Sequence, residues 1–198
     1  LLGIVAGLVA GLGLALLLEF LDSSVTTQLE IEERLGVTFL GFVPSIPDSA
    51  TQGQSKDLHI HREPKSHIAE CTRAVRTNLL FMSPDKPFKR MVVTSSGPQE
   101  GKSTTAINLG IAMSQSGQKV LIVDTDMRRP RLHKAFGVAN EMGVSSLVVG
   151  EGKLDDAIKT TEVPGLYLLP CGPIPPNPAE LLHTRAFADL LETLGTKF

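Results

Sequence analysis

One short segment restricts the fold of this chain more than any other. Gly101-Lys102-Ser103 lies between an apolar segment, Met91–Thr94, and residues 102–116, whose apolar positions have helical spacing. A turn between a strand and a helix directs backbone N–H groups and the positive end of the helix dipole at an anion. A turn of this kind with Gly-Lys-Ser is typical of phosphate-binding loops. We therefore predict an α/β fold with a nucleotide phosphate at the start of residues 102–116.

The predicted phosphate loop runs from Ser96 to Ser103. Ser96 stands where the usual pattern has Gly, and the neighbouring Gly97 can supply the turn. Gly101 allows close backbone approach, Lys102 places a positive charge by the β- and γ-phosphates, and the Ser103 hydroxyl can bind Mg²⁺. Thr104 follows directly and is expected to contact the α-phosphate. The predicted nucleotide-binding residues are Gly97, Pro98, Gln99, Glu100, Gly101, Lys102, Ser103 and Thr104.

A second motif ends an almost wholly apolar segment, Lys119–Asp124, with two carboxylates, Asp124 and Asp126. In a parallel sheet, ligands gather beyond the carboxyl ends of the strands, so we expect both acids near Lys102. One carboxylate can hold Mg²⁺ while the other accepts a proton from an attacking hydroxyl. The alternative is a pair of acids that only caps a turn.

Further segments alternate between strand and helix patterns. A third predicted strand is Leu166–Leu169, and predicted helices cover residues 64–82, 131–136, 144–149, 154–159 and 178–194. Apolar strands alternating with helices predict a parallel sheet that is covered on both faces.

The first residues form a separate pattern. Leu1 to Leu18 contains no charged residue and spans about 27 Å as a helix, close to the thickness of a hydrocarbon core. We predict a transmembrane helix at residues 1–20; a signal peptide or a buried core helix are the alternatives. Residues 21–63 are predicted to be a juxtamembrane segment and linker. Within them, residues 23–36 have a helix pattern, residues 37–43 favour a strand, and residues 48–64 have the polar composition of a linker.

Charge and cysteine content exclude some classes of function. The chain has 19 Lys+Arg and 21 Asp+Glu, a net charge of −2, which gives no reason to expect nucleic-acid binding. Cys71 and Cys171 are far apart and form no metal motif, so we interpret them as reduced thiols. His59, His61 and His67 are interpreted as solvated linker residues.

Several segments together resemble the bacterial tyrosine kinases of capsule and exopolysaccharide assembly. Residues 94–103 resemble their Walker A loop, in which Ser at the first position is usual, and residues 123–130 resemble their Walker A′ motif. The spacing Glu70-x-x-Arg73-x-x-Arg76 is similar to their helix motif for subunit contacts, and residues 175–182 are similar to a further family segment. Residues 1–20 and 40–44 resemble the end of a polysaccharide chain-length (Wzz-type) domain.

The resemblance implies a P-loop NTPase-type parallel sheet, preceded by a transmembrane helix, in an ATP-dependent protein tyrosine kinase. Such a kinase would autophosphorylate between subunits and regulate polysaccharide polymerisation and export. It would lie at the bacterial inner membrane, with its kinase domain, residues 64–198, in the cytoplasm. Lys102 and Ser103 would bind ATP and Mg²⁺, Asp124 would help deprotonate the tyrosine, and Asp126 would support metal and catalysis. Implied partners are further subunits in a ring, the polysaccharide machinery and protein tyrosine substrates.

The implied subunit contacts belong to Glu70, Arg73 and Arg76, although a local Glu70–Arg73 pair is an alternative. The family also has a Walker B strand ending in Asp and a tyrosine-rich tail, and neither is present in these 198 residues. Because the chain also begins with Leu, we expect a fragment with an incomplete sheet. Two other functions stay open. One is a partition or division-type ATPase, although such proteins usually carry an additional Lys at the position that Gly97 occupies in this chain. The other is a non-catalytic chain-length scaffold that binds ATP.

Overall fold

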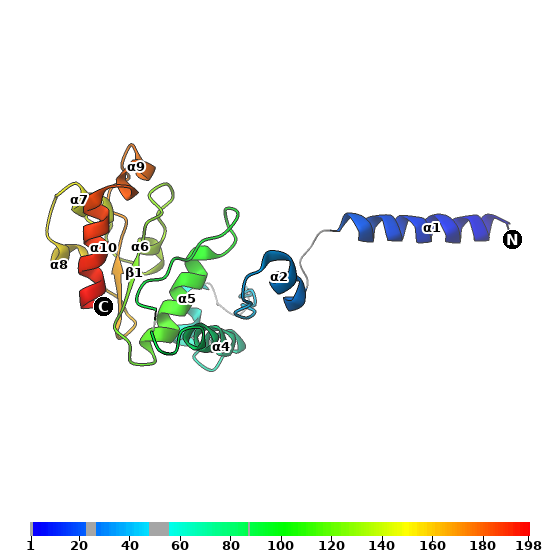
Figure 1. Cartoon of the computed structure of the whole chain (residues 1–198), viewed down its shortest axis with the longest axis horizontal. Coiled ribbons are helices and arrows are strands. Elements are labelled where there is room, and N and C mark those ends of the chain that lie inside the picture. The colour runs from blue at the N-terminus through cyan, green and yellow to red at the C-terminus, as the bar shows by residue number, and fades with distance from the viewer. Residues whose placement is uncertain (1, 23–26, 48–55, 87) are drawn as a thin grey trace. The chain divides into compact units, whose positions relative to one another are not determined.

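The computed structural model describes residues 2–22, 27–47, 56–86 and 88–198 (Figure 1). It divides into two compact units, Leu1–Phe39 and Leu40–Phe198. The predicted kinase domain, residues 64–198, lies within the second unit, together with residues 40–47 and 56–63.

The first unit contains two helices. α1 spans Leu2–Leu21, and its residues 3–21 form a helix that is long and apolar enough to cross a bilayer. α2 spans Gln28–Leu35, where the Thr27 hydroxyl accepts a hydrogen bond from Glu30 N–H at 3.3 Å and Gly36 ends the helix in the left-handed region. The helix predicted at residues 1–20 is confirmed as a helix over residues 2–20, and the helix predicted at residues 23–36 is confirmed over residues 28–35, while residues 1 and 23–26 lie outside the described residues.

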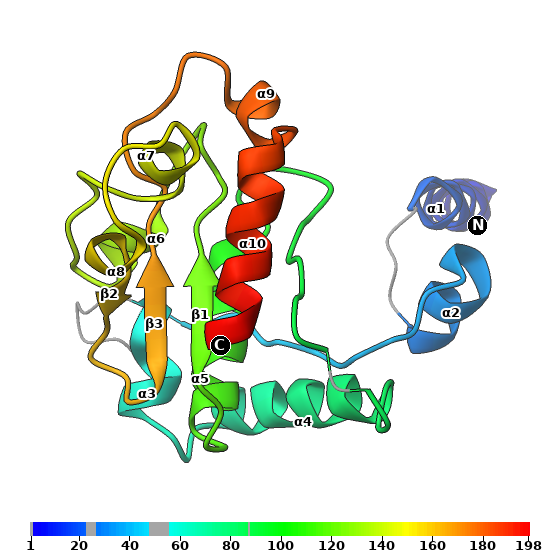
Figure 2. The same cartoon turned by 60° about the vertical axis from the view of Figure 1, so that its left-hand side comes forward.

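The second unit is built on a sheet of three strands in the order β1-β3-β2. β1 (Val120–Val123) and β3 (Leu166–Leu169) run parallel, with Val120 opposite Leu166 and Val123 opposite Leu169 (Figure 2). Both predicted strands and their parallel pairing are confirmed. A two-residue strand, β2 (Lys159–Thr160), pairs antiparallel with β3, where we had predicted the end of a helix.

Helices cover both faces of this sheet because its strands are apolar on both sides. On one face, Ile122 and Leu168 pack into a core that the helices α3 (His59–Arg62), α4 (His67–Phe81), α5 (Lys102–Ser114) and α6 (Leu132–Ala135) complete. On the other, Leu121 and Leu169 meet α7 (Val144–Val148), α8 (Leu154–Ala157), α9 (Pro178–Leu182) and α10 (Arg185–Lys197). Each fully buried side chain of this size contributes about 1.5–3 kcal/mol to folding.

The predicted strand at Met91–Thr94 is wrong. Residues 91–94 form no strand, and Val92 is 91% exposed. An extended segment becomes a strand only when a neighbouring strand pairs with its N–H and C=O groups. Within the described residues, no backbone hydrogen bond joins this segment to β1 or to another strand, so its apolar sequence alone does not make it a strand. Residues 37–43, also predicted to favour a strand, are irregular for the same reason.

The predicted linker is also wrong over its second half. Residues 56–62 form the short 3-10 helix η2 (Lys56–Leu58) and α3, and Leu58 and Ile60 are buried against Ile107 and Ile111 of α5. His59 is likewise buried rather than solvated. Two apolar side chains within a polar segment anchor it to the core, although the average composition resembles a linker. The first half, residues 48–55, lies outside the described residues.

Candidate functional site

The predicted phosphate loop leads into α5 as expected. Gly101 has φ 87°, a left-handed conformation that glycine adopts without strain, and it is the residue from which α5 starts. The first N–H to join the helix is that of Thr105, which donates to the Gly101 carbonyl at 2.8 Å. In the described part of the chain no backbone acceptor pairs with the N–H groups of residues 102–104. These N–H groups can therefore bind an anion.

A carboxylate of the loop itself accepts hydrogen bonds inside the loop. Gly97 N–H donates to Glu100 Oε2 at 2.9 Å, and the Ser96 hydroxyl donates to Glu100 Oε1 at 3.0 Å. These bonds, the Gly97 N–H bond first, hold the pKa of Glu100 below its ordinary value. Gln99, between them, has φ 64°, which is unusual for a residue with a side chain. A phosphate that uses the Gly97 N–H must therefore displace Glu100.

Asp124 directly follows β1 and is 3% exposed. Its Oδ2 accepts from Leu132 N–H at 3.1 Å and from Arg131 N–H at 3.3 Å, and its Oδ1 accepts from Asp126 N–H at 3.2 Å. Burial raises the pKa of this carboxyl, and the three backbone donors oppose that rise. The fold thus holds a proton acceptor in a fixed orientation at the carboxyl end of the sheet.

Asp126 lies in a different environment from Asp124. It is exposed, and its Oδ1 accepts from Arg128 N–H at 3.3 Å and from Arg129 N–H at 3.0 Å. We expected the two acids to share one edge of the sheet, and both do follow β1. Because one carboxylate is buried and the other open to solvent, they are suited to different roles.

The structure adds a residue that the sequence did not point to. Asp57 is 4% exposed, and both of its carboxylate oxygens accept hydrogen bonds from Arg131 Nη2, at 2.9 and 2.8 Å. The Thr104 hydroxyl donates to Asp57 Oδ1 at 3.2 Å. Asp57 therefore joins α5, which carries the phosphate loop, to the segment that holds Asp124. The sequence gives no signal for this contact, because Asp57 lies in a polar stretch 74 residues before Arg131.

Cys171 follows β3 and lies near the two acids. Its side chain is fully buried, and burial, together with the charges of Asp124 and Asp126, raises the pKa of its thiol from 9.0 to about 11. Cys71 and Cys171 are both free in the structure, and their interpretation as reduced thiols stays a prediction.

The raised pKa predicts a difference in reactivity between the two cysteines. At about pH 8, Cys171 should hold about 100-fold less thiolate than a cysteine at its ordinary pKa, and only the thiolate is nucleophilic. Iodoacetamide should therefore alkylate the partly exposed Cys71 and leave Cys171 unmodified until the pH approaches about 11 or the chain unfolds. Peptide mass spectrometry measures both sites, and equal labelling of the two in the folded protein would contradict the prediction.

The residues predicted to bridge subunits make contacts within this chain. Arg73 Nη2 donates to Glu70 Oε1 at 2.6 Å and to the Pro64 carbonyl at 2.8 Å. Arg76 Nη1 donates to the Ala112 carbonyl at 2.8 Å, which ties α4 to α5. The local Glu70–Arg73 pair is thus present, and Glu70 keeps 65% of its side chain exposed. Their role between subunits stays a prediction.

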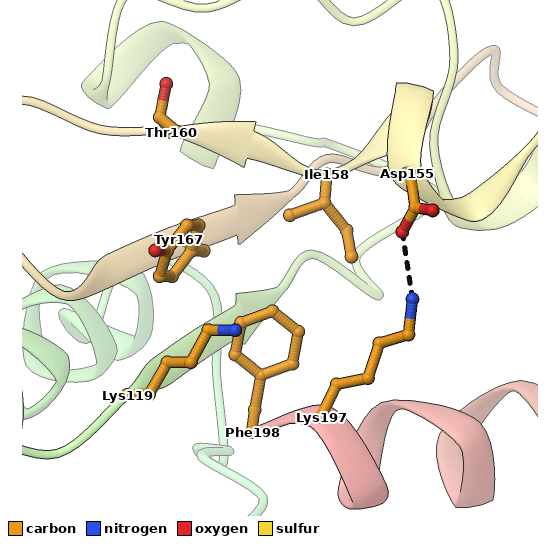
Figure 3. A pocket seen from close by; sticks show the side chains of 7 residues that line it. All are labelled: Lys119, Asp155, Ile158, Thr160, Tyr167, Lys197 and Phe198. Carbon is orange, nitrogen blue, oxygen red and sulfur yellow. Dashed lines mark hydrogen bonds and ion pairs between the residues drawn. The ribbon is translucent and has the colours of Figure 1, made fainter.

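A cavity lies away from these residues (Figure 3). It has a volume of about 300 Å³ and is lined by Lys119, Asp155, Ile158, Thr160, Tyr167, Lys197 and Phe198. Lys197 Nζ pairs with Asp155 Oδ1 at 2.9 Å, and Lys119 Nζ lies 4.7 Å from the centre of the Phe198 ring. Because Lys119 directly precedes β1, it lies at the opposite end of that strand from Asp124. The cavity is therefore separate from the candidate site.

Comparisons with known proteins agree with this geometry. A family model described as an AAA domain matches residues 94–174, which include the phosphate loop and both acids. The tyrosine-protein kinase YwqD of Bacillus subtilis (strain 168) is 43% identical over 128 residues, 65% of this chain and 54% of that protein. The tyrosine-protein kinase ptk of Acinetobacter johnsonii is 32% identical over 203 residues, 100% of this chain and 28% of that protein.

A solved structure extends the likeness to the fold. The BceF tyrosine kinase domain matches with a TM-score of 0.77 at 30% identity, over 88% of this chain and 74% of that chain. This confirms the predicted P-loop fold, which is a nucleotide-binding fold. The chain spans 54% of the length of YwqD and 28% of the length of ptk. On these matches, the chain belongs to the family of bacterial tyrosine-protein kinases.

Proposed function

We propose that this chain carries the nucleotide-binding and catalytic residues of an ATP-dependent protein tyrosine kinase. The observation that supports this best is the buried Asp124 at the end of β1, linked through Arg131 and Asp57 to the helix that begins at the phosphate loop. A phosphate cradle beside an oriented carboxylate suits transfer of a phosphoryl group to a hydroxyl.

The nucleotide is ATP in this proposal, bound by residues 97–104. The N–H groups of Lys102 and Ser103 and the Lys102 ammonium bind the β- and γ-phosphates, whose negative charge they offset, and Thr104 contacts the α-phosphate. Lys102 is the catalytic cation, because its charge also stabilises the phosphoryl group as it moves from one oxygen to the other.

Mg²⁺ is the proposed metal, and the donor set fits it. Ser103 and Asp126 offer a hydroxyl and a carboxylate, and Mg²⁺ is usually held by one or two protein oxygens together with phosphate oxygens and water. Bound there, the ion would neutralise charge on the phosphates. Among the described residues, no group of three His, Cys, Asp or Glu side chains is arranged to hold a metal by itself.

Asp124 is the proposed general base. Three backbone N–H donors fix its orientation, and burial raises its pKa, so the ionised form is a better proton acceptor than an ordinary exposed carboxylate. It accepts the proton of a tyrosine hydroxyl while the hydroxyl oxygen attacks the γ-phosphorus of ATP and ADP leaves.

The setting of this activity is also part of the proposal. α1 anchors the chain in the bacterial inner membrane, the second unit lies in the cytoplasm, and Glu70, Arg73 and Arg76 contribute to contacts between subunits of a ring. The subunits phosphorylate one another's tyrosines and regulate polysaccharide polymerisation and export. The length and apolar character of α1 and the exposure of Glu70 are compatible with these roles.

The test is the reaction itself. The full-length protein, purified in detergent micelles, is incubated with γ-labelled ATP and Mg²⁺, and phosphotyrosine is measured by acid hydrolysis and by mass spectrometry. Transfer of label to tyrosine supports the proposal. ATP hydrolysis without phosphotyrosine would instead support a partition-type ATPase, and ATP binding without either reaction would support a scaffold.

The Glu100 carboxylate gives a prediction about affinity. Glu100→Gln replaces a charged acceptor for Gly97 N–H by a weaker neutral one and removes a negative charge from the loop. We expect ATP to bind about two- to tenfold more tightly, the effect of one hydrogen bond of about 0.5–1.5 kcal/mol. A fluorescent ATP analogue measures the Kd. Glu192→Gln on α10 makes the same change of charge at an exposed position outside the loop and should leave the Kd unchanged; weaker binding by Glu100→Gln would show that Glu100 assists the nucleotide.

A further inference from the structure

We propose that Asp57 is a positioning residue that holds the two halves of the catalytic site together. It does not itself touch the nucleotide. It fixes the side chain of Arg131, whose backbone N–H orients Asp124, and it binds the hydroxyl of Thr104 on the phosphate-loop helix. The inference rests on the proposed function for its effect on catalysis, but the contact itself can be tested without nucleotide.

The segment that carries Asp57 is firmly placed. Leu58 is 3% exposed and Ile60 is 2% exposed, and both belong to the core that contains Ile107 and Ile111 of α5. The burial of these two side chains, directly after Asp57, fixes η2 against α5 and leaves Asp57 little freedom to follow a moving partner. Arg131 and Thr104 are therefore held in relation to a rigid element.

The contact between Asp57 and Arg131 is of a strong kind. Both Asp57 oxygens accept from Arg131 Nη2, and the carboxylate is buried while the Arg131 side chain is 50% exposed. A charge-assisted bond to a buried carboxylate is stronger than one in open solvent, and removing one partner leaves the other unsatisfied. The backbone N–H of Arg131 donates to Asp124 Oδ2. If the Arg131 side chain loses its contact with Asp57, the Arg131 backbone is held less firmly, and one of the three donors that orient Asp124 is weakened.

Thr104 connects the same carboxylate to the phosphate loop. A threonine hydroxyl has one proton to donate, and Thr104 donates it to Asp57 Oδ1. The same proton cannot also be donated to an α-phosphate oxygen, so the predicted contact of Thr104 with the α-phosphate falls to its backbone N–H. Asp57 thus aligns the first turn of α5 and the segment after β1 with each other.

The first experiment measures hydrogen exchange in the nucleotide-free full-length protein. Asp57→Asn keeps the shape of the side chain and removes its charge, and we expect faster exchange in a peptide that covers residues 124–132. Asp189→Asn is the matched control, because Asp189 forms an exposed pair with Arg185 on α10 at 3.0 Å and should leave that peptide unchanged. Unchanged exchange in Asp57→Asn overturns the inference. A rise spread evenly over residues 88–198 also overturns it, because it shows a general loss of stability.

The second experiment measures steady-state kinetics. Asp57→Asn should lower kcat by about tenfold to 100-fold, the size expected when a reacting group is misplaced, and leave KM for ATP within about threefold. Arg131→Gln should also lower kcat, and the double variant should be no worse than the more impaired single variant, because both changes remove the same Asp57–Arg131 contact. Additive losses overturn the inference. If the unmodified protein makes no phosphotyrosine, the proposed function fails, while the exchange result still decides the role of Asp57.

Discussion

Lys102→Met should abolish phosphotyrosine formation. The lysine is the first residue of α5 and follows Gly101, whose left-handed conformation ends the loop. Removing one charged donor from a phosphate costs about 1.5–3 kcal/mol in binding, and the loss is greater in the transition state, where the charge on the moving group changes. We therefore expect ATP to bind about 10- to 100-fold more weakly and kcat to fall by at least about 100-fold.

The matched control for this variant is Lys153→Met. Lys153 is exposed and precedes α8, where its side chain makes no capping hydrogen bond, so the same loss of charge should leave ATP binding and phosphotyrosine formation unchanged. Circular dichroism establishes that both variants fold. Labelling of tyrosine that persists in folded Lys102→Met would show that another group serves the phosphates, and would contradict the assignment of residues 97–104 as the nucleotide site.

The sequence predicted the elements whose pattern is local. Val120–Val123 and Leu166–Leu169 are apolar throughout, as strands buried on both faces must be, and they form the strands expected. Met91–Thr94 is also largely apolar and β-favouring but forms no strand, because strand formation also needs a neighbour with which to pair. For that reason the sequence of a segment can indicate that it suits a strand without showing that it becomes one.

The candidate site divides in the same way. The residues from Gly97 to Thr104 and the pair Asp124 and Asp126 follow motifs of a few residues, so the sequence alone could propose them, and their roles stay predictions. Asp57 belongs to no motif, and its importance comes from Arg131, far away in the chain. Contacts of this kind depend on the packing of the whole unit, so only the structure reveals them. The burial that distinguishes Asp124 from Asp126 has the same origin.

Asp124→Asn should remove catalysis while leaving the nucleotide site intact. Asn has almost the same shape as Asp but cannot accept a proton from a tyrosine hydroxyl, and loss of a general base typically lowers kcat by about 10²- to 10⁴-fold. The Kd for ATP should change little, because Asp124 is not among the phosphate-binding groups. Phosphotyrosine formation under saturating ATP measures the first effect, and a fluorescent ATP analogue measures the second.

The fold should tolerate this change, which makes the result interpretable. Burial disfavours the ionised form of Asp124, so a neutral Asn removes the free-energy cost of burying a charge. Against this, the side-chain NH2 group of Asn would face a backbone N–H that donates a hydrogen bond to the carboxylate in the unmodified protein, and that hydrogen bond would be lost. These effects oppose each other, and we expect only a small change in the thermal midpoint. Asp189→Asn, exposed on α10, controls for the chemical change alone. Loss of a general base should lower kcat by more than about tenfold. If Asp124→Asn keeps kcat within about tenfold of that of the unmodified protein, Asp124 is therefore not the base. The buried carboxylate would then act only as the acceptor that fixes the turn after β1.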